Sequence, residues 1–388
     1  MNMTWQRCPC SPRESIPTVL MVEWKHPFLE QRPYIRPSLN QARIVDLPGV
    51  HLPWDVRGKT GYQLLSSHFW RQRILAAFPE LAASPDVFRA FDRYLADGVG
   101  RALLIGEEYG RSLGYLLLML KRGDAVNRVV RPDWQAVHWQ FWREITTIWL
   151  GGGLMAGHLG QLTAATAQAV LRRHHFPEMT VSCAPYAAAL PLMGVARTAP
   201  AAAAAMLVFD FGQTSLKRAV AVYDAGQLLA LHPLPAWPAA CTHMEAYNNV
   251  EIARHTAVSL LQVMAQSWQE AVRAGWQLSP HMAASIACYL VNGHPALPWD
   301  MGCYGRLQLL TPHLPTYLAA QVSELVGSPL KLQLFHDGTA AALTYAAAGK
   351  TGALGKTAVL TLGTAIGNGF PPAATTLRPI HADFQLVK

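Results

Sequence analysis

Apolar and polar positions recur along the chain with two spacings, one typical of helices and one typical of strands. Helical spacing, near three and four residues, is clearest between Pro85 and Arg122. The apolar positions of that stretch are Phe88, Phe91, Leu95, Val99, Leu103 and Leu104. Glycines then repeat every four residues, at Gly106, Gly110 and Gly114. That repeat favours close packing against another helix. We expect further helices at Gly157–His174, Val250–Ala274, Thr316–Val326 and Ala340–Ala348.

Short apolar runs bounded by turn residues predict strands. We expect them at Ala42–Val45, Ile145–Leu150, Met206–Asp210, Arg218–Tyr223, Leu228–His232, Ile286–Val291, Leu330–Phe335 and Thr357–Leu362. Asp224-Ala225-Gly226 predicts a hairpin turn, whereas several other strands lead directly into helices. Hairpins mixed with strand–helix units predict an α/β fold with a mixed sheet.

An alanine-rich stretch, residues 199–205, separates two halves of different pattern. It offers no side chain able to specify a site, so it reads as a linker or joint. A chain of 388 residues is too long for one compact core, which predicts two lobes. We expect a larger lobe from residues 1–198 and 351–388, a smaller lobe from residues 206–350, and the joint between them.

Composition narrows the class of protein. Residues are 51% hydrophobic and only 14% charged, which supports a folded core rather than disorder. The net charge of +8 permits an anionic ligand such as a nucleotide. Nucleic-acid binding is disfavoured because no run of five or more Lys and Arg occurs. The apolar stretch Met179–Ala196 contains Pro185 and Pro191, so we expect a buried segment with a helix and no membrane association.

The cysteines do not form a recognisable metal or disulfide framework. Cys8 and Cys10 are close in sequence, but no matching pair follows them at Cys183, Cys241, Cys288 or Cys303. We therefore expect reduced thiols in a cytoplasmic protein. The first fifteen residues, MNMTWQRCPCSPRES, have no apolar core, so no signal peptide is expected.

Several strand ends carry small or polar residues, and ligands gather at the carboxyl ends of strands in α/β sheets. The first such junction contains Asp210, Gly212, Thr214 and Lys217. Its turn can offer backbone N–H groups and a hydroxyl to phosphate oxygens, and Asp210 could hold Mg²⁺ through water. The alternative is an ordinary hairpin with a polar tip.

A second junction contains Gly363, Thr364 and Gly367, where glycines permit close approach of backbone to phosphates. A third contains Gly151, Gly152 and Gly153, which leave a flat surface for a planar base. The alternatives are a glycine-rich hairpin and a tight strand–helix turn.

The fourth junction places Asp337 between a strand and a helix. A carboxylate facing a cleft there can accept a proton from a substrate hydroxyl. The alternative is a helix N-cap, and both roles can coexist.

Together these motifs resemble the actin, heat-shock chaperone and sugar kinase superfamily, and within it the ROK sugar kinases. Asp210–Lys217 resembles the first phosphate motif, Gly363–Gly369 the second, and Leu150–Gly153 the adenosine motif. Phe335–Leu343, FHDGTAAAL, is similar to the family segment that carries the catalytic Asp. The resemblance implies a two-lobed actin-like ATPase (ribonuclease H-like) fold, ATP and Mg²⁺ as cofactors, and Asp337 as the base.

For the acceptor, the resemblance implies a small hydroxylated substrate, with a sugar as the leading candidate. Candidate substrate contacts are His336, His313, His294 and Gly293, although a histidine in such a position is more often structural. The sequence departs from the family in lacking its cysteine-rich zinc motif and its E-x-G-H segment. Gln213 replaces a glycine, and His336 replaces an asparagine. The oligomeric state stays open, with a homodimer as one option.

The order of the motifs is unusual. The family runs first phosphate motif, catalytic Asp, second phosphate motif and adenosine motif, but here the adenosine-like motif comes first. Reading from Met206 to Lys388 and on from Met1 to Arg197 restores the family order. We therefore expect a circular permutant, with residues 199–205 at the old join of the termini.

Phosphoryl transfer from ATP to a hydroxyl is the preferred function. The rival is a non-catalytic protein that senses a nucleotide or a sugar on the same fold, since fold does not fix function. A third option is a structural protein that uses the cleft only for stability.

Overall fold

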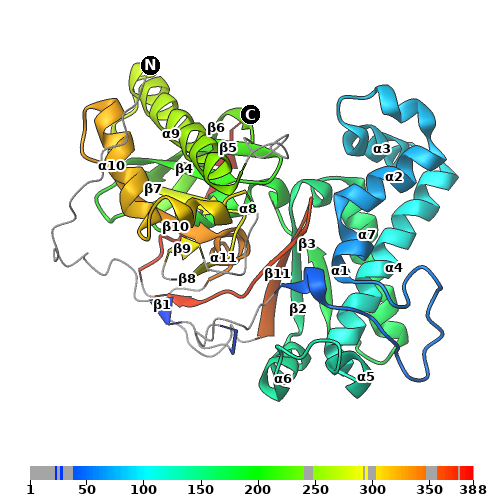
Figure 1. Ribbon diagram of the computed structural model, residues 1–388. Helices are drawn as coiled ribbons and strands as arrows, with labels where there is room; N and C mark the ends of the chain where they lie inside the picture. Colours follow the sequence, from blue (N-terminus) through cyan, green and yellow to red (C-terminus); the bar gives the residue numbers. More distant parts are fainter. Residues whose placement is uncertain are drawn as a thin grey trace.

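The computed structural model describes residues 22–23, 27–28, 38–239, 248–291, 293–295, 303–346, 356–374 and 376–387. These residues form two lobes, each built on its own mixed sheet with helices packed against it (Figure 1). The α/β class and the two-lobed organisation expected from the sequence are therefore confirmed.

The first lobe contains a six-stranded sheet in the order β10-β7-β4-β5-β6-β14. Its strands are β4 (Ala205–Phe211), β5 (Ser215–Asp224), β6 (Gln227–Pro238), β7 (Leu278–Ile286), β10 (Lys331–His336) and β14 (Ile380–Leu386). β4, β5 and β6 form an antiparallel meander, whereas β7 and β10 run parallel to β4. Every position of β4 is buried, which explains its uninterrupted apolar sequence.

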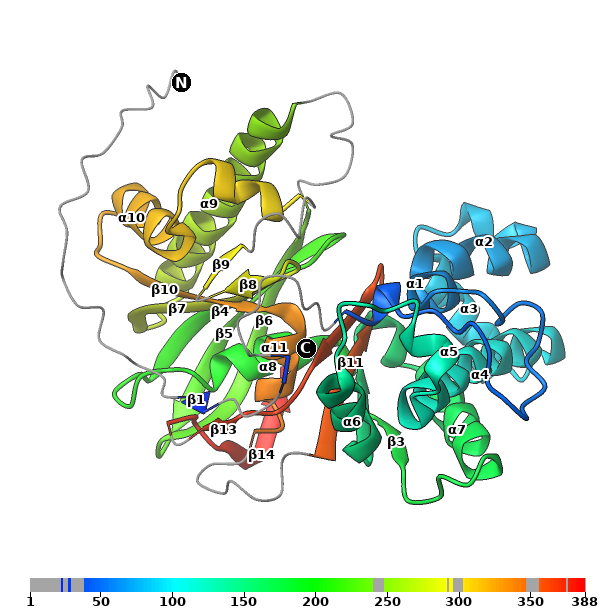
Figure 2. The same ribbon diagram turned by 60° about the horizontal axis from the view of Figure 1, so that its bottom comes forward.

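Alternate residues of β4 face two different helical layers. Leu207 and Phe209 belong to the core formed with α9 (Asn249–Arg273) and α10 (Leu314–Val326). Met206 and Val208 belong to the core on the other face, formed with α8 (Leu190–Ala196). The sheet is thus covered on both faces, as Figure 2 shows from a second direction.

The second lobe contains a four-stranded sheet in the order β12-β11-β2-β3. Its strands are β2 (Thr147–Gly151), β3 (Thr180–Cys183), β11 (Thr357–Leu362) and β12 (Ile366–Gly369). β11 and β12 form an antiparallel hairpin, and β2 and β3 run parallel to β11. The helices of this lobe are α1 (Gly61–Leu65), α2 (Ser67–Ala77), α3 (Val87–Ala96), α4 (Gly100–Arg122), α5 (Ala125–Arg128), α6 (Ala136–Glu144) and α7 (His158–Arg173).

Helix packing in this lobe follows the glycine repeat. A Cβ at Gly106, Gly110 or Gly114 would lie 2.6–2.7 Å from side-chain atoms of α7. The three glycines therefore let α4 and α7 approach closely, as the sequence predicts.

Short elements complete the described chain. They are β1 (Val22–Glu23) paired with β13 (Ala373–Ala374), β8 (Leu290–Val291) paired with β9 (His294–Pro295), and the 3-10 turns Leu39–Gln41, Pro79–Ala83, Gly153–Met155, Ala187–Ala189 and Gly305–Leu309.

Two helices cross between the lobes. α8 packs on α11 (Asp337–Leu343) so closely that a Cβ at Gly194 would lie 1.7 Å from the carbonyl oxygen of Ala340. The buried Arg197 guanidinium then donates to carbonyl oxygens at the end of α11, those of Leu343, Thr344 and Ala346. These contacts fix the position of α11, which carries Asp337 at its first turn.

Some sequence expectations are wrong. Within the described ranges, residues 42–45 form one isolated bridge, Arg43 to Thr60, and join neither of the two large sheets. Around residue 286 the strand ends rather than begins, since β7 pairs with β4 through Leu278–Ile286. Residues 351–388 were expected in the larger lobe, but β14 pairs with β6 of the six-stranded sheet and not with the four-stranded sheet.

The cysteines need one correction. Cys183 is a free thiol, whereas Cys303 is disulfide-bonded. The expectation that all cysteines are reduced thiols is therefore wrong. The spacing of cysteines in the sequence does not show which of them a fold brings together. Cys8, Cys10 and Cys241 lie outside the described residues. None of the helices in the described ranges is long and apolar enough to cross a membrane.

Candidate active site

A cavity of about 1220 Å³ lies between the two sheets and is lined by residues of both lobes. Its lining includes most of the residues expected to bind a nucleotide: Asp210, Gly212, Thr214, Lys217, Gly363, Thr364, Gly367, Gly152 and Gly153. Asp337 and His336 line the same cavity. The fold therefore brings four separate parts of the sequence to one place.

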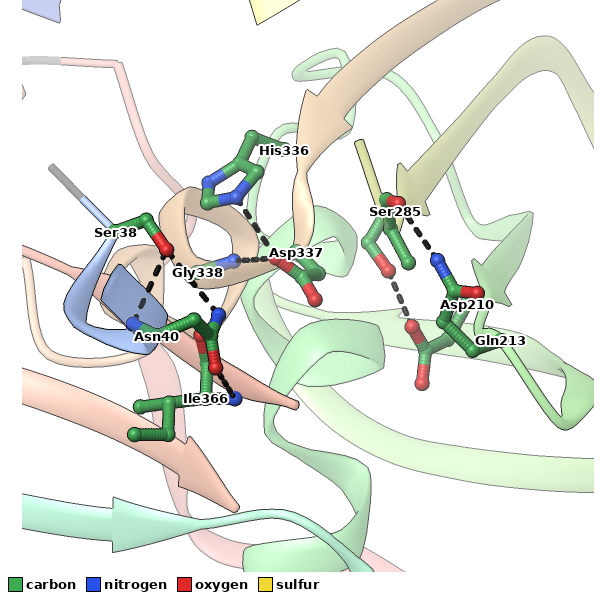
Figure 3. Close-up of polar contacts among 10 residues, drawn as sticks. Ser38, Asn40, Asp210, Gln213, Ser285, His336, Asp337, Gly338 and Ile366 are labelled. Carbon is green, nitrogen blue, oxygen red and sulfur yellow. Dashed lines mark hydrogen bonds and ion pairs between the residues drawn. The ribbon is translucent and has the colours of Figure 1, made fainter. Parts of the chain in front are cut away.

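Asp210 occupies the end of β4 with its carboxylate buried. Ser285 of β7 donates a 2.5 Å hydrogen bond to Oδ1 (Figure 3). The Lys217 ammonium lies 3.1 Å from Oδ2. Lys217 also donates to the carbonyl oxygen of Ala188 at 3.1 Å. Both oxygens of Asp210 are thus engaged. Ser285 was not expected from the sequence, because it lies within an apolar run, residues 282–286, that carries no turn or ligand signal.

The turn after β4 is held by side chains from distant segments. Tyr304 donates from its hydroxyl to the carbonyl oxygen of Gly212 at 2.7 Å, and Gln213 donates to that of Ala287 at 3.3 Å. Burial raises the pKa of Tyr304, and the nearby Asp210 charge adds to this, so its hydroxyl stays protonated and remains a donor. These contacts fix the turn that carries Gly212 and Thr214.

The second glycine-rich loop, between β11 and β12, is held from the N-terminal part of the chain. The side-chain amide of Asn40 donates to the carbonyl oxygen of Ile366 at 2.9 Å and accepts from its N–H at 2.8 Å (Figure 3). The backbone N–H of Ser67, at the start of α2, donates to the carbonyl oxygen of Gly363 at 2.8 Å. Asn40 thus pairs with the open edge of β12 as a neighbouring strand would.

Asp337 is the first residue of α11, and His336 is the N-cap. Asp337 Oδ1 accepts from the N–H of Gly338 at 2.6 Å and lies 3.0 Å from His336 Nε2 (Figure 3). The His336 ring stacks on Tyr289 with centroids 4.5 Å apart. The carboxylate is therefore held in one orientation at the carboxyl end of β10.

Asp337 lies directly beside the second loop. A Cβ at Gly367 would be 3.3 Å from Asp337 Oδ2 and 2.2 Å from the hydroxyl oxygen of Thr361. Only glycine leaves room here for the carboxylate and the loop to meet. The candidate base and one of the two glycine-rich loops are consequently neighbours.

The third glycine motif divides into two parts. Gly152 and Gly153 line the cavity, whereas Gly151 is buried and a Cβ there would lie 2.5 Å from Leu190. Gly151 is therefore a packing residue rather than part of the cavity wall. α2 and α3 contribute further lining residues that were not expected from the sequence: Arg71, Phe88, Arg89 and Asp92. Asp92 accepts a 2.8 Å hydrogen bond from the N–H of Leu159 and so caps α7.

The remaining substrate candidates lie elsewhere. Gly293, His294 and His313 do not belong to the lining of this cavity within the described ranges. The rings of His294 and His313 are 5.1 Å apart, and His294 accepts from the N–H of Leu314 at 3.2 Å. Burial lowers the pKa of His294, and His313 lowers it further. These histidines form a structural cluster at the start of α10.

The part of the chain that the structure describes holds no cluster of three or more His, Cys, Asp or Glu able to bind a metal. Asp210 is the buried carboxylate of the first loop. One carboxylate is enough for Mg²⁺, which keeps several waters and takes its other ligands from substrate phosphates. The residues therefore fit a Mg²⁺ that is bound together with a nucleotide.

Comparison with known proteins gives little. No family model matches the chain, and no curated protein matches it. Among solved structures, an inorganic polyphosphate/ATP-glucomannokinase from Arthrobacter sp. strain KM is similar, with 19% sequence identity and a TM-score of 0.28. The match covers 46% of this chain and 62% of that enzyme, so it spans less than two thirds of the enzyme's length. At this TM-score the likeness carries no inference about activity.

Proposed function

We propose that this protein is an ATP-dependent phosphotransferase that acts on the hydroxyl of a small substrate, with a sugar as the leading candidate. The observation that carries the proposal is the position of Asp337 beside Gly367, where a Cβ would lie 3.3 Å from the carboxylate. A base next to a glycine-rich loop is the arrangement needed to bring a hydroxyl to a phosphate.

Phosphoryl transfer is catalysed mainly by positioning and electrostatics. Gly212 and Thr214 would offer N–H groups and a hydroxyl to phosphate oxygens from the first lobe. Gly363, Thr364 and Gly367 would do so from the second lobe. The two loops face one cavity from opposite sheets, so a triphosphate between them would be surrounded by donors.

Asp337 would accept the proton of the acceptor hydroxyl and orient its oxygen toward the phosphate. The contact with His336 and the N–H of Gly338 fixes its carboxylate in advance. Asp210 would hold Mg²⁺, which neutralises charge on the phosphates when it is bound. The adenine ring of ATP would lie against Gly152 and Gly153.

A circular permutation is also part of the proposal. The first lobe contains a meander followed by two strands parallel to its first strand, in the order β6-β5-β4-β7-β10. The second lobe has the same pattern with one strand fewer, in the order β12-β11-β2-β3. There, however, the parallel strands β2 and β3 precede the hairpin in sequence. A relocation of the chain termini would produce this inverted order of the strands. The inverted order therefore supports the proposed permutation.

A thermal-shift titration with Mg-ATP, followed by a panel of sugars, tests the function. A ligand that binds only the folded state raises the unfolding temperature by mass action. We expect a rise with Mg-ATP and a further rise with one sugar. A rise with ATP alone would favour the sensing function, and no rise would remove the kinase proposal.

Asp337→Asn tests the mechanism. We expect turnover to fall by at least about 100-fold, the low end of general-base contributions, with nearly unchanged ATP affinity. Asp383→Asn is the matched control, because Asp383 is 86% exposed and does not line the cavity. Equal turnover in Asp337→Asn and the control would remove Asp337 from the mechanism.

A further inference from the structure

The Lys217 ammonium lies 3.1 Å from Oδ2 of Asp210, the carboxylate that is proposed to hold a divalent cation. We infer that Lys217 is a built-in substitute for the metal: it neutralises Asp210 in the nucleotide-free protein and must release the carboxylate before a divalent cation can bind. The site would therefore take the metal together with the nucleotide and exclude the metal alone. This inference rests on the proposed nucleotide site and adds an order of binding to it.

The two partners differ in how firmly they are held. The Asp210 side chain is 8% exposed, and Ser285 fixes one of its oxygens at 2.5 Å. The Lys217 side chain is 37% exposed and faces the cavity. The carboxylate is therefore the fixed partner, whereas the flexible lysine stem can move its ammonium to another acceptor.

Charge balance explains why a substitute is needed. An unpaired buried carboxylate is strongly unfavourable, so Asp210 requires a cation whether or not a metal is present. Within the described residues, Lys217 is the cation that forms an ion pair with it. Mg²⁺ alone would have to displace this ammonium and lose water. A bound nucleotide favours metal binding, because its phosphate oxygens can accept hydrogen bonds from the Lys217 ammonium and can also serve as metal ligands.

Release of Lys217 would also break a second contact. The same ammonium donates to the carbonyl oxygen of Ala188 at 3.1 Å. Ala188 lies in the segment between β3 and α8, and it lines the cavity. Departure of Lys217 therefore frees a carbonyl group at the start of the helix that packs on α11.

Mn²⁺ binding to the full chain, followed by the electron paramagnetic resonance signal of free Mn²⁺, tests the inference. Without nucleotide, we expect weak binding to the wild type and at least tenfold tighter binding to Lys217→Met. Lys331→Met removes the same charge at an exposed position outside the cavity and should match the wild type. Asp210→Asn combined with Lys217→Met should lose the gain.

A second measurement uses the wild type alone, so it does not depend on how well a variant folds. We expect Mn²⁺ to bind at least tenfold more tightly to the protein together with a non-hydrolysable ATP analogue. The references are Mn²⁺ binding to the protein alone and to the analogue alone. Equal nucleotide-free Mn²⁺ affinity in the wild type and Lys217→Met would overturn the inference, as would tight binding to the wild type without nucleotide. If the protein binds no ATP, the nucleotide-free comparison still decides the role of Lys217, and only the proposed function fails.

Discussion

The hydroxyl of Tyr304 donates a 2.7 Å hydrogen bond to the carbonyl oxygen of Gly212 and so connects two segments 92 positions apart in the sequence. Tyr304 is 1% exposed, so the contact is shielded from water. Gly212 lies in the turn that is proposed to bind phosphate. The contact therefore stabilises the conformation of this turn.

Tyr304→Phe should lower the free energy of unfolding by about 1 kcal/mol, the usual net value of one hydrogen bond. Nucleotide affinity should also fall, because the turn loses its anchor. The control is Tyr317→Phe, since the Tyr317 hydroxyl is buried without a partner among the described residues. That variant should be as stable as the wild type or more stable. Urea unfolding and ATP titration measure both effects; equal losses in the two variants would contradict the prediction.

Asn40→Ala removes both hydrogen bonds to Ile366 and should cost about 2 kcal/mol of stability. Because the second loop then loses its support, ATP affinity should fall as well. Asn127→Ala is a matched control. Asn127 makes the same kind of contact, accepting from the N–H of Val45 and donating to the carbonyl of Asp46, but away from the cavity. It should lose stability and keep its ATP affinity. Loss of affinity in both variants would indicate a general effect of instability.

Two glycines of the second loop should respond differently to alanine. At Gly363 a Cβ would meet no atom within 4 Å, so Gly363→Ala should change stability by less than about 0.5 kcal/mol. At Gly367 the Cβ would collide with Thr361, and Gly367→Ala should cost roughly 1–3 kcal/mol. If phosphate approaches the loop backbone, Gly363→Ala should still weaken ATP binding about tenfold, the effect of ~1.4 kcal/mol. Unchanged ATP affinity in Gly363→Ala would place the phosphates elsewhere.

The proposed permutation predicts that residues 206–388 do not fold into an ATP-binding unit. Such a fragment keeps the β11–β12 hairpin but lacks β2, which pairs with β11, and β3, which pairs with β2. An unpaired hairpin is marginally stable at best. Circular dichroism and ATP titration of the fragment provide the test, and a cooperatively unfolding fragment that binds ATP would refute the permutation.

The sequence predicted those parts of the site whose signal is local. Asp210, Gly212, Gly363 and Asp337 each lie at a strand end, where an apolar run meets small or polar residues. Several helices and strands were predicted for the same reason. α4, α7 and β11, for example, have clear periodicity and begin or end within a few residues of the expected positions.

The supporting residues could not be predicted in this way. Asn40 contacts a residue 326 positions away, and Ser285 and Tyr304 reach the first loop across 75 and 92 positions. No short pattern marks such a residue, because its partner is defined only by the fold. β14 was misplaced for a related reason: its assignment depends on the sheet edge that accepts it and not on its own sequence. His294 and His313 were grouped with the site from the sequence, but they do not line the described cavity, since a histidine's sequence position does not distinguish ligand contact from packing.

The contact between Gly194 and Ala340 has a consequence for motion and cooperativity. Because α8 and α11 touch backbone to backbone there, the crossing is too tightly packed to slide, so the lobes are expected to rotate about it as about a pivot. A ligand that closes the cleft would then change the angle between the sheets and leave the pivot intact. Amide protons of α8 and α11 should consequently exchange slowly in both states, and the two lobes should unfold as a single cooperative unit.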